Sequence, residues 1–263
     1  MINSVSDELK LPSFRLDEKV ALVTGAGRGL GAAIAEGYAQ AGAEVILLGR
    51  TRSYLEDLSE RIGAGGGRAR VVECDVTNDR ALRDAIAALP VLDIAVNNAG
   101  TNFPEPFVEV SDEHLDSMLD LNVRACFVAA QACVRKMLED RARAGKGGVV
   151  INVSSQMGHV GSPNRTVYCM TKHALEGLTK AMAVELAPQN IRVNSIGPTF
   201  TDTPLMRTVV DTPEKRDFIM SRIPMGKLAS LEDIAAAAVY LASPAAAMIT
   251  GTHLIVDGGW TAQ

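Results

Sequence analysis

The stretch K-V-A-L-V-T-G-A-G-R-G-L-G, from Lys19 to Gly31, indicates how the whole chain folds. Its apolar first half has the composition of a fully buried strand, and the Ala-rich run at 32–41 has that of a helix. A glycine turn between a strand and a helix is an anion site, because free backbone N–H groups and the helix dipole converge there. Such a cluster can be a plain turn, but its position favours binding of a nucleotide phosphate. The residues expected around the phosphate are Gly25, Arg28, Gly29, Leu30 and Gly31.

The rest of the chain repeats this alternation of strand and helix. Further strands are predicted at 44–48, 70–73, 92–96, 148–153, 191–196 and 253–256, and helices at 52–62, 78–89, 112–138, 166–187 and 231–241. Strands and helices that alternate through right-handed crossovers form a parallel sheet with helices on both faces. We therefore predict an α/β fold in which one doubly wound Rossmann-type domain with a seven-stranded parallel sheet, at 19–263, follows an N-terminal extension at 1–18.

One segment, 198–230, interrupts the alternation. It contains Pro204, Pro213 and Pro224, and a connection of this length inside a compact domain is uncommon and usually functional. We interpret it as a flap with short helices that covers the substrate. The alternative is a mobile surface excursion.

Composition argues against several classes of protein. The formal net charge of −5 disfavours a nucleic-acid-binding or anionic-membrane surface, since both need clustered positive charge. The N-terminal residues lack the basic and apolar regions of a secretory signal, and no apolar run approaches about 18 residues, so we expect no membrane span. The four cysteines include no C-x-x-C pair, which favours a reduced, cytoplasmic protein. The four histidines are scattered, so no metal site is predicted.

A second informative stretch runs from Asn152 to Lys172. Tyr168 and Lys172 are four residues apart, so on a helix they share one face. A cation close to a phenol favours the phenolate, which suits a group that exchanges protons near neutral pH. Ser155 follows a predicted strand, where parallel strands deliver residues to a ligand crevice. The hydroxyl and the phenol could therefore hold one substrate oxygen, although an ordinary amphipathic helix start would also fit the Tyr-x-x-x-Lys spacing.

Together these motifs resemble the short-chain dehydrogenase/reductase family of single-domain enzymes. The resemblance extends from Phe14 to Trp260 and includes T-G-x-x-x-G-x-G at 24–31, N-N-A-G at 97–100, Y-x-x-x-K at 168–172 and V-D-G-G at 256–259. It implies the strand order 3-2-1-4-5-6-7. It also implies an NAD(P)-dependent oxidoreductase, in which hydride passes between the nicotinamide and the carbinol carbon of the substrate.

The resemblance implies roles for individual residues as well. Tyr168 would be the general acid/base, Lys172 would bond the nicotinamide ribose, and Ser155 would hold the substrate oxygen. Asn122, a poor helix former in a helical segment, would kink its helix and position a water near Lys172. Further cofactor contacts are implied for Asp75, Val76, Asn98, Ala99, Gly100, Pro198 and Thr203, with Thr199 where the family usually has glycine.

The end of the second strand favours NADP(H) over NAD(H). Relatives that use NAD have an acidic residue there, which bonds the 2′-hydroxyl of the adenosine. Here the position is Gly49, and Arg50 and Arg28 can make forked bonds to a 2′-phosphate. The alternative is that both arginines are solvated surface charges.

The substrate is less well defined by the sequence. Gln156, His159, Asn164 and Arg165 lie between Ser155 and Tyr168, and their polarity suggests a sugar, polyol or keto acid. One alternative is reduction of a 3-oxoacyl group on acyl carrier protein, docked on Arg141, Arg143 and Lys146; against it, the usually basic position before Asn190 is Gln189. A dinucleotide-sensing regulator is a second alternative, but such proteins commonly lose the acid/base residue.

The helix that begins near Tyr168 has two apolar faces. One face carries Leu175, Leu178 and Met182, and the other carries the smaller Ala174, Gly177, Ala181 and Val184. Because a monomer needs only one buried face, the second face predicts a homo-oligomer, either a dimer or a tetramer.

Overall fold

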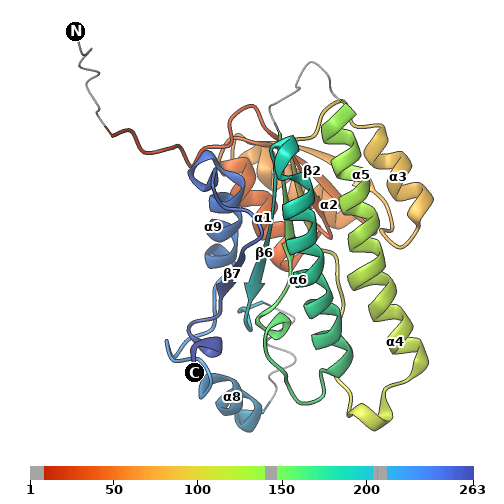
Figure 1. Ribbon diagram of the computed structural model, residues 1–263, viewed down its shortest axis with the longest axis vertical. Helices are drawn as coiled ribbons and strands as arrows, with labels where there is room; N and C mark the ends of the chain where they lie inside the picture. Colours follow the sequence, from red (N-terminus) through yellow and green to blue (C-terminus); the bar gives the residue numbers. More distant parts are fainter. Residues whose placement is uncertain (1–8, 140–146, 204–205, 207–211) are drawn as a thin grey trace.

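The computed structural model describes residues 9–139, 147–203, 206 and 212–263, and these form one parallel sheet with helices on both sides (Figure 1). The seven strands lie in the order β3-β2-β1-β4-β5-β6-β7, which confirms the order that the family resemblance implies. Their bounds are β1 Val20–Thr24, β2 Glu44–Gly49, β3 Arg68–Glu73, β4 Ile94–Asn97, β5 Gly148–Val153, β6 Ile191–Pro198 and β7 His253–Val256.

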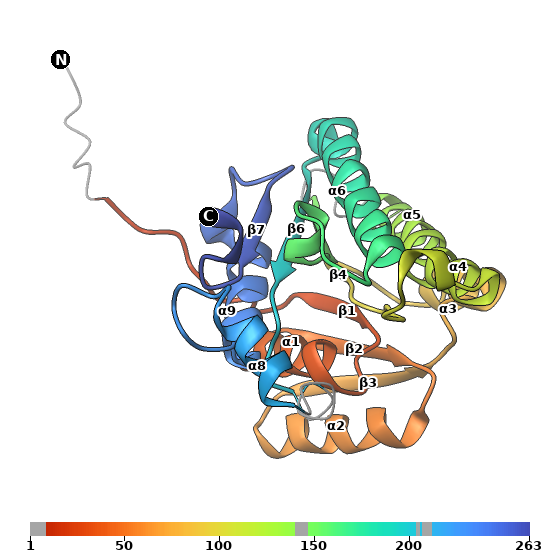
Figure 2. The same ribbon diagram turned by 90° about the horizontal axis from the view of Figure 1, so that it is seen from below.

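The helices form two layers. The layer on one face of the sheet contains α1, α2 and α9, and the other contains α3, α4, α5 and α6 (Figure 2). The main helices are α1 Gly29–Gln40, α2 Arg52–Ala64, α3 Asp79–Ala87, α4 Asp112–Leu119, α5 Ala125–Glu139, α6 Thr166–Leu186, α8 Pro213–Met220 and α9 Leu231–Ala242. The single-turn helices named below are η2 Asp120–Arg124 and η4 Gln156–Gly158.

The core is split between these two layers because successive side chains of a strand point to opposite faces. On β1, Ala21 and Val23 belong to the layer under α1 and α9, whereas Leu22 belongs to the layer under α5. All three side chains are at most 1% exposed. A sheet buried on both faces explains why its strands read as continuous apolar runs.

Three regions add to or differ from the sequence-based expectation. The helix predicted at 112–138, in which Asn122 is expected to cause a kink, is divided there by a π-helical turn, η2, and the side chain of Asn122 is bonded outside the helix. Leu16, expected in the N-terminal extension, is 1% exposed, and its N–H donates to Ala41 O. Within 198–230 the structure describes α8 and a short bridge between Thr201 and Ala229, whereas Pro204 lies outside the described residues.

No helix in the described ranges has the length and apolar character needed to cross a membrane.

Candidate active site

The carboxyl ends of β1, β4 and β5 meet at one edge of the sheet, where the N-N-A-G motif fastens the glycine turn. The side chain of Asn98 donates to Thr24 O at 2.9 Å and to Gly25 O at 3.2 Å. In return, Thr24 Oγ1 accepts the N–H groups of Asn98 and Ala99 at 3.0 and 3.2 Å. The two motifs therefore form one rigid unit, and Thr24 and Asn98 have a structural role within it.

The glycine turn leaves room for a phosphate-bearing ligand. A side chain at Gly31 would come within 2.4 Å of Gly25 O, so the backbone packs too closely for any other residue. Gly29 adopts a φ of +59°, and no atom lies within 4 Å of the place where its Cβ would be. The side chain of Arg28 makes no capping bond to the first turn of α1. Open space before an uncapped helix N-terminus fits the diphosphate of a dinucleotide.

Two arginines flank this space. Gly49 ends β2, and the side chains of Arg50 and Arg28 are exposed and form no ion pair with any residue in the part of the chain that the structure describes. By contrast, the nearby Arg52 is paired with Glu56 at 2.7 Å. Arg28 and Arg50 therefore carry positive charges that are available to an anionic ligand.

Asn122 lies at the centre of a complete hydrogen-bond network. Its Oδ1 accepts the N–H of Thr101 at 2.8 Å, and its Nδ2 donates to Thr101 O at 2.9 Å and to Thr171 Oγ1 at 3.2 Å. Thr171 Oγ1 in turn donates to Tyr168 O at 2.8 Å. Since Asn122 is 1% exposed, these bonds replace water that it cannot reach. The π-helical turn thus connects the loop after β4 to the start of α6.

The other three predicted catalytic residues lie beside this network. Ser155, which is 5% exposed, donates through Oγ to Gln156 Oε1 at 2.7 Å and accepts the N–H of Met157 at 3.1 Å. Lys172 Nζ donates to Val153 O at 2.9 Å and lies 5.5 Å from the centroid of the Tyr168 ring. The structure therefore brings Asn122, the end of β5 and the start of α6 together at one edge of the sheet.

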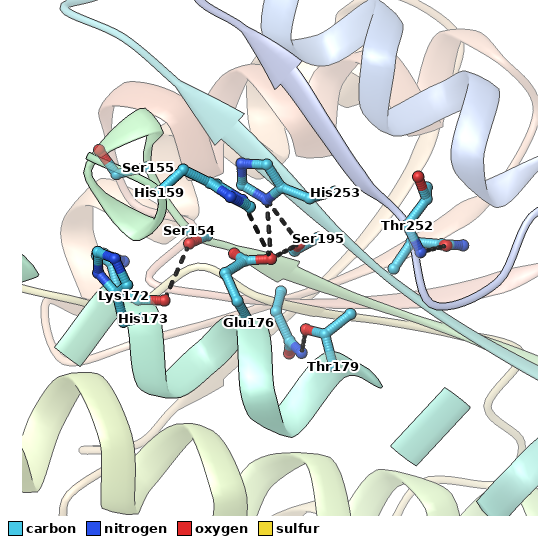
Figure 3. A network of polar contacts seen from close by, with 12 residues as sticks. Ser154, Ser155, His159, Lys172, His173, Glu176, Thr179, Ser195, Thr252 and His253 are labelled. Carbon is cyan, nitrogen blue, oxygen red and sulfur yellow. Dashed lines mark hydrogen bonds and ion pairs between the residues drawn. The ribbon is translucent and has the colours of Figure 1, made fainter. Parts of the chain in front are cut away.

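The four predicted substrate residues separate into two groups. Gln156 is buried and bonded to Ser155, and Asn164 adopts a φ of +58°, with its carbonyl accepting the N–H of Glu105 at 3.1 Å. Arg165 precedes α6 and is partly buried, which lowers the pKa of its guanidinium. The ring of His159, however, turns toward Glu176 and His253, as Figure 3 shows.

Sequence reasoning missed Thr101 and Thr171, which bind the side chain of Asn122. They lie 21 and 49 residues from Asn122 in the sequence, and no spacing rule links threonines to an asparagine over such separations. The remaining predicted cofactor residues follow the strand ends: Val76 is buried, Asp75 Oδ1 accepts from the N–H and hydroxyl of Thr77, and Pro198 ends β6. Thr203 Oγ1 accepts the N–H of Met206 at 3.1 Å.

Comparisons with known proteins match nearly the whole chain. The model of a family described as enoyl-(acyl carrier protein) reductase matches residues 25–261. L-xylulose reductase from Bos taurus is 38% identical over 94% of this chain and 98% of its own. D-threitol dehydrogenase from Mycolicibacterium smegmatis is 41% identical over 94% of this chain and 95% of its own. The crystal structure of a gluconate 5-dehydrogenase from Burkholderia cenocepacia, in complex with NADP and tartrate, superposes with a TM-score of 0.89 at 33% identity, covering 95% of this chain and 98% of that one.

The fold and these matches define an oxidoreductase that depends on a nicotinamide dinucleotide. The chain belongs to the short-chain dehydrogenase/reductase family.

Proposed function

We propose that this enzyme interconverts a secondary alcohol and a ketone on a small polyhydroxylated substrate, a sugar, polyol or keto acid, with NADP(H) as its cofactor. The observation that carries the proposal is the grouping of Asn122, Ser155, Tyr168 and Lys172 at the sheet edge beside the glycine turn. The names of the relatives, a xylulose reductase, a threitol dehydrogenase and a gluconate dehydrogenase, support the same class of substrate.

Each of the four residues has a separate task in this proposal. The phenol of Tyr168 gives a proton to the substrate oxygen during reduction and takes it back during oxidation, and the hydroxyl of Ser155 orients that oxygen. Lys172 holds a positive charge beside the phenol and bonds the ribose of the cofactor. Asn122 keeps the start of α6 in place through Thr171. When bound, the nicotinamide supplies or accepts the hydride.

The cofactor would lie across the carboxyl edge of the sheet. The residues that would hold it are Gly25, Arg28, Gly29, Leu30, Gly31, Arg50, Asp75, Val76, Asn98, Ala99, Gly100, Tyr168, Lys172, Pro198 and Thr203. Preference for NADP(H) rests on Gly49, which offers no carboxylate, and on the guanidinium groups of Arg28 and Arg50, which form no ion pair with the described residues.

We expect the double substitution Gly49→Asp and Arg50→Ala to shift this preference. The new carboxylate would repel a 2′-phosphate and bond a 2′-hydroxyl, so the ratio of kcat/KM for NADPH to that for NADH should fall at least about tenfold. The matched control is Arg52→Ala, because Arg52 is paired with Glu56 and should not contact the cofactor. An unchanged ratio in the double variant would contradict the assignment.

The substrate pocket is proposed to be polar. Gln156 has its amide next to the hydroxyl of Ser155, and Asn164 and Arg165 lead into α6 from the same loop. These groups can bond the hydroxyl or carboxylate groups of a polyhydroxylated substrate. Reduction of a 3-oxoacyl group on acyl carrier protein is the second candidate; the description of the family that matches names the same carrier protein, with a different reduction. Its predicted docking residues Arg141, Arg143 and Lys146 lie outside the described residues.

The test is the rate of NADPH oxidation with two sets of carbonyl substrates. One set contains a ketotetrose, a ketopentose and a ketohexonate, and the other contains an acetoacetyl thioester presented with and without acyl carrier protein. We expect turnover of at least one member of the first set. Turnover of the thioester alone, with a rate on the carrier protein that falls at moderate salt, would instead support the second candidate.

We also propose that the enzyme is a homo-oligomer that assembles through the outer face of α6. Ala174, Gly177, Ala181 and Val184 are all exposed there, and Val184 is 81% exposed. Val184→Lys should therefore lower the oligomeric state measured by light scattering at micromolar concentration. A wild-type monomer under these conditions would contradict the proposal.

The four thiols support the proposal of a cytoplasmic location. All four cysteines are free, and burial raises the pKa of Cys126 and Cys133 to about 12, so neither is a reactive thiolate.

A further inference from the structure

One group of titratable side chains, partly buried and partly open to solvent, takes no part in the proposed reaction. It consists of His159, Glu176 and His253, and we call it the histidine–glutamate cluster (Figure 3). His159 follows η4, Glu176 lies on α6, and His253 begins β7. Each residue offers one atom that could bind a metal, a ring nitrogen or a carboxylate oxygen, and these three atoms all lie within 4.8 Å of one another.

The carboxylate of Glu176 is at the centre of the cluster. Its Oε2 lies 2.9 Å from His253 Nδ1 and 3.8 Å from His159 Nε2, and it accepts the hydroxyl of Ser195 at 2.8 Å. The two imidazole rings have their centroids 3.9 Å apart. On the far side of the His253 ring, Nε2 faces Gly197 so closely that a Cβ there would be 2.3 Å away. The ring is therefore held with Nδ1 toward the carboxylate.

The carboxylate of Glu176 is buried with one oxygen that has no partner. Glu176 is 5% exposed, its Oε1 makes no hydrogen bond to the described residues, and its only ion-pair partners among them are the two histidines. A buried carboxylate oxygen without a partner costs free energy, and a cation held in the cluster would supply the missing interaction.

We propose that the histidine–glutamate cluster binds a divalent transition-metal cation of the Zn²⁺ type through His159 Nε2, His253 Nδ1 and the carboxylate of Glu176. Two imidazoles and a carboxylate are a donor set that such cations prefer, and a water completes four-coordination. Metal–donor distances of about 2.0–2.2 Å place tetrahedral donors about 3.4 Å apart. This separation lies between the distances of Glu176 Oε2 from His253 Nδ1, 2.9 Å, and from His159 Nε2, 3.8 Å. Binding requires neutral imidazoles and an ionised carboxylate, so it competes with protonation of the cluster.

The position of the site indicates a structural role. The metal would join the segment after Ser155, the helix that carries Tyr168 and Lys172, and the last strand of the sheet. The side chain of His159 is 34% exposed, which leaves a path from solvent to the cluster. We expect the bound metal to raise the melting temperature, since a ligand that binds only the folded chain stabilises it.

The experiment uses the full, untagged chain, freed of metal by a chelator and then titrated with ZnCl₂ in a calorimeter. We expect one Zn²⁺ per chain, with a Kd of about 1 μM or below, and a rise in melting temperature of several degrees when Zn²⁺ is in excess. His159→Gln removes a ligand from a partly exposed position, where the chain should still fold, and should weaken binding at least about tenfold. Glu176→Gln should weaken it as well.

The matched control is His173→Gln. His173 lies on the exposed side of α6, where its Nδ1 contacts Cys169 O at 2.8 Å, and it takes no part in the cluster. The affinity of the His173→Gln variant for Zn²⁺ should equal that of the wild type. Less than one Zn²⁺ per wild-type chain at 100 times the expected Kd, about 100 μM, would overturn the proposal. Equal affinity in the wild type and in His159→Gln would also overturn it.

Discussion

Two buried polar centres contact helix α6, and they differ in whether their hydrogen bonds are complete. Around Asn122, both side-chain polar atoms are bonded, to Thr101 and Thr171. In the histidine–glutamate cluster, Glu176 Oε1 has no partner among the described residues. A completed network holds its neighbours in one position, whereas a buried carboxylate oxygen without a partner leaves capacity for a ligand. The first centre therefore suits positioning of the catalytic residues, and the second suits binding of a cation.

Removal of the Asn122 side chain from its completed hydrogen-bond network should have the larger effect on stability and on kcat. Asn122→Ala removes the bonds to both backbone groups of Thr101 and the bond that the hydroxyl of Thr171 accepts, so we expect a loss of about 3 kcal/mol in the free energy of unfolding. Because α6 carries Tyr168, kcat should also fall at least about tenfold. Urea unfolding and initial rates measure the two effects. A variant with the stability and kcat of the wild type would show that the network does not position the helix.

A smaller effect is expected at the edge of the same network. Thr171→Val keeps the shape of the side chain but removes the hydroxyl that bonds Asn122 and the carbonyl of Tyr168. We expect the free energy of unfolding to fall by about 1–2 kcal/mol and kcat to fall less than in Asn122→Ala. Thr171→Ser, which keeps the hydroxyl, is the control and should retain most of the wild-type kcat. If Thr171→Val lost more activity than Asn122→Ala, Asn122 would not be the centre of the network.

In the histidine–glutamate cluster, loss of the negative charge of Glu176 should have the smallest effect on the free energy of unfolding. Without metal, Glu176→Gln should change the free energy of unfolding at pH 7 by no more than about 1 kcal/mol, because the lost bonds offset the lower cost of burial. Burial alone would raise the pKa of Glu176, but its bonds lower it below the ordinary value of 4.5. Its carboxylate therefore contributes stability above about pH 4.5, and this contribution is lost as the pH falls through the lower, folded value.

The measurement is urea unfolding of wild type and Glu176→Gln between pH 7 and pH 3 in the presence of a chelator. The stability difference between the two proteins should remain constant down to about pH 4.5 and change only below it. A difference that changed mainly between pH 5 and pH 7 would contradict this prediction, because the pH dependence would then come from a histidine of the cluster and not from the carboxylate of Glu176.

Most strand and helix bounds could be predicted from the sequence, because strand and helix periods are local properties. β5 and β7, for example, have the predicted bounds. The order of the strands came from the family resemblance and not from these periods. Prediction was not possible for the hydrogen-bond partners of Asn122 or for the histidine–glutamate cluster. Both depend on side chains brought together by the packing of distant elements, as when the pairing of β6 with β7 places His253 opposite Ser195. Four histidines that are scattered in the sequence therefore include two whose rings contact each other in the fold.

The account rests most directly on the role of Tyr168, and Tyr168→Phe tests that role. Turnover of the best ketone substrate and binding of NADPH, followed by its fluorescence, are measured on the wild type and on the variant. We predict that kcat falls at least about 100-fold, the usual contribution of a positioned acid/base group, while the Kd for NADPH changes little. A variant that retained most of its turnover would contradict the assignment of the catalytic site.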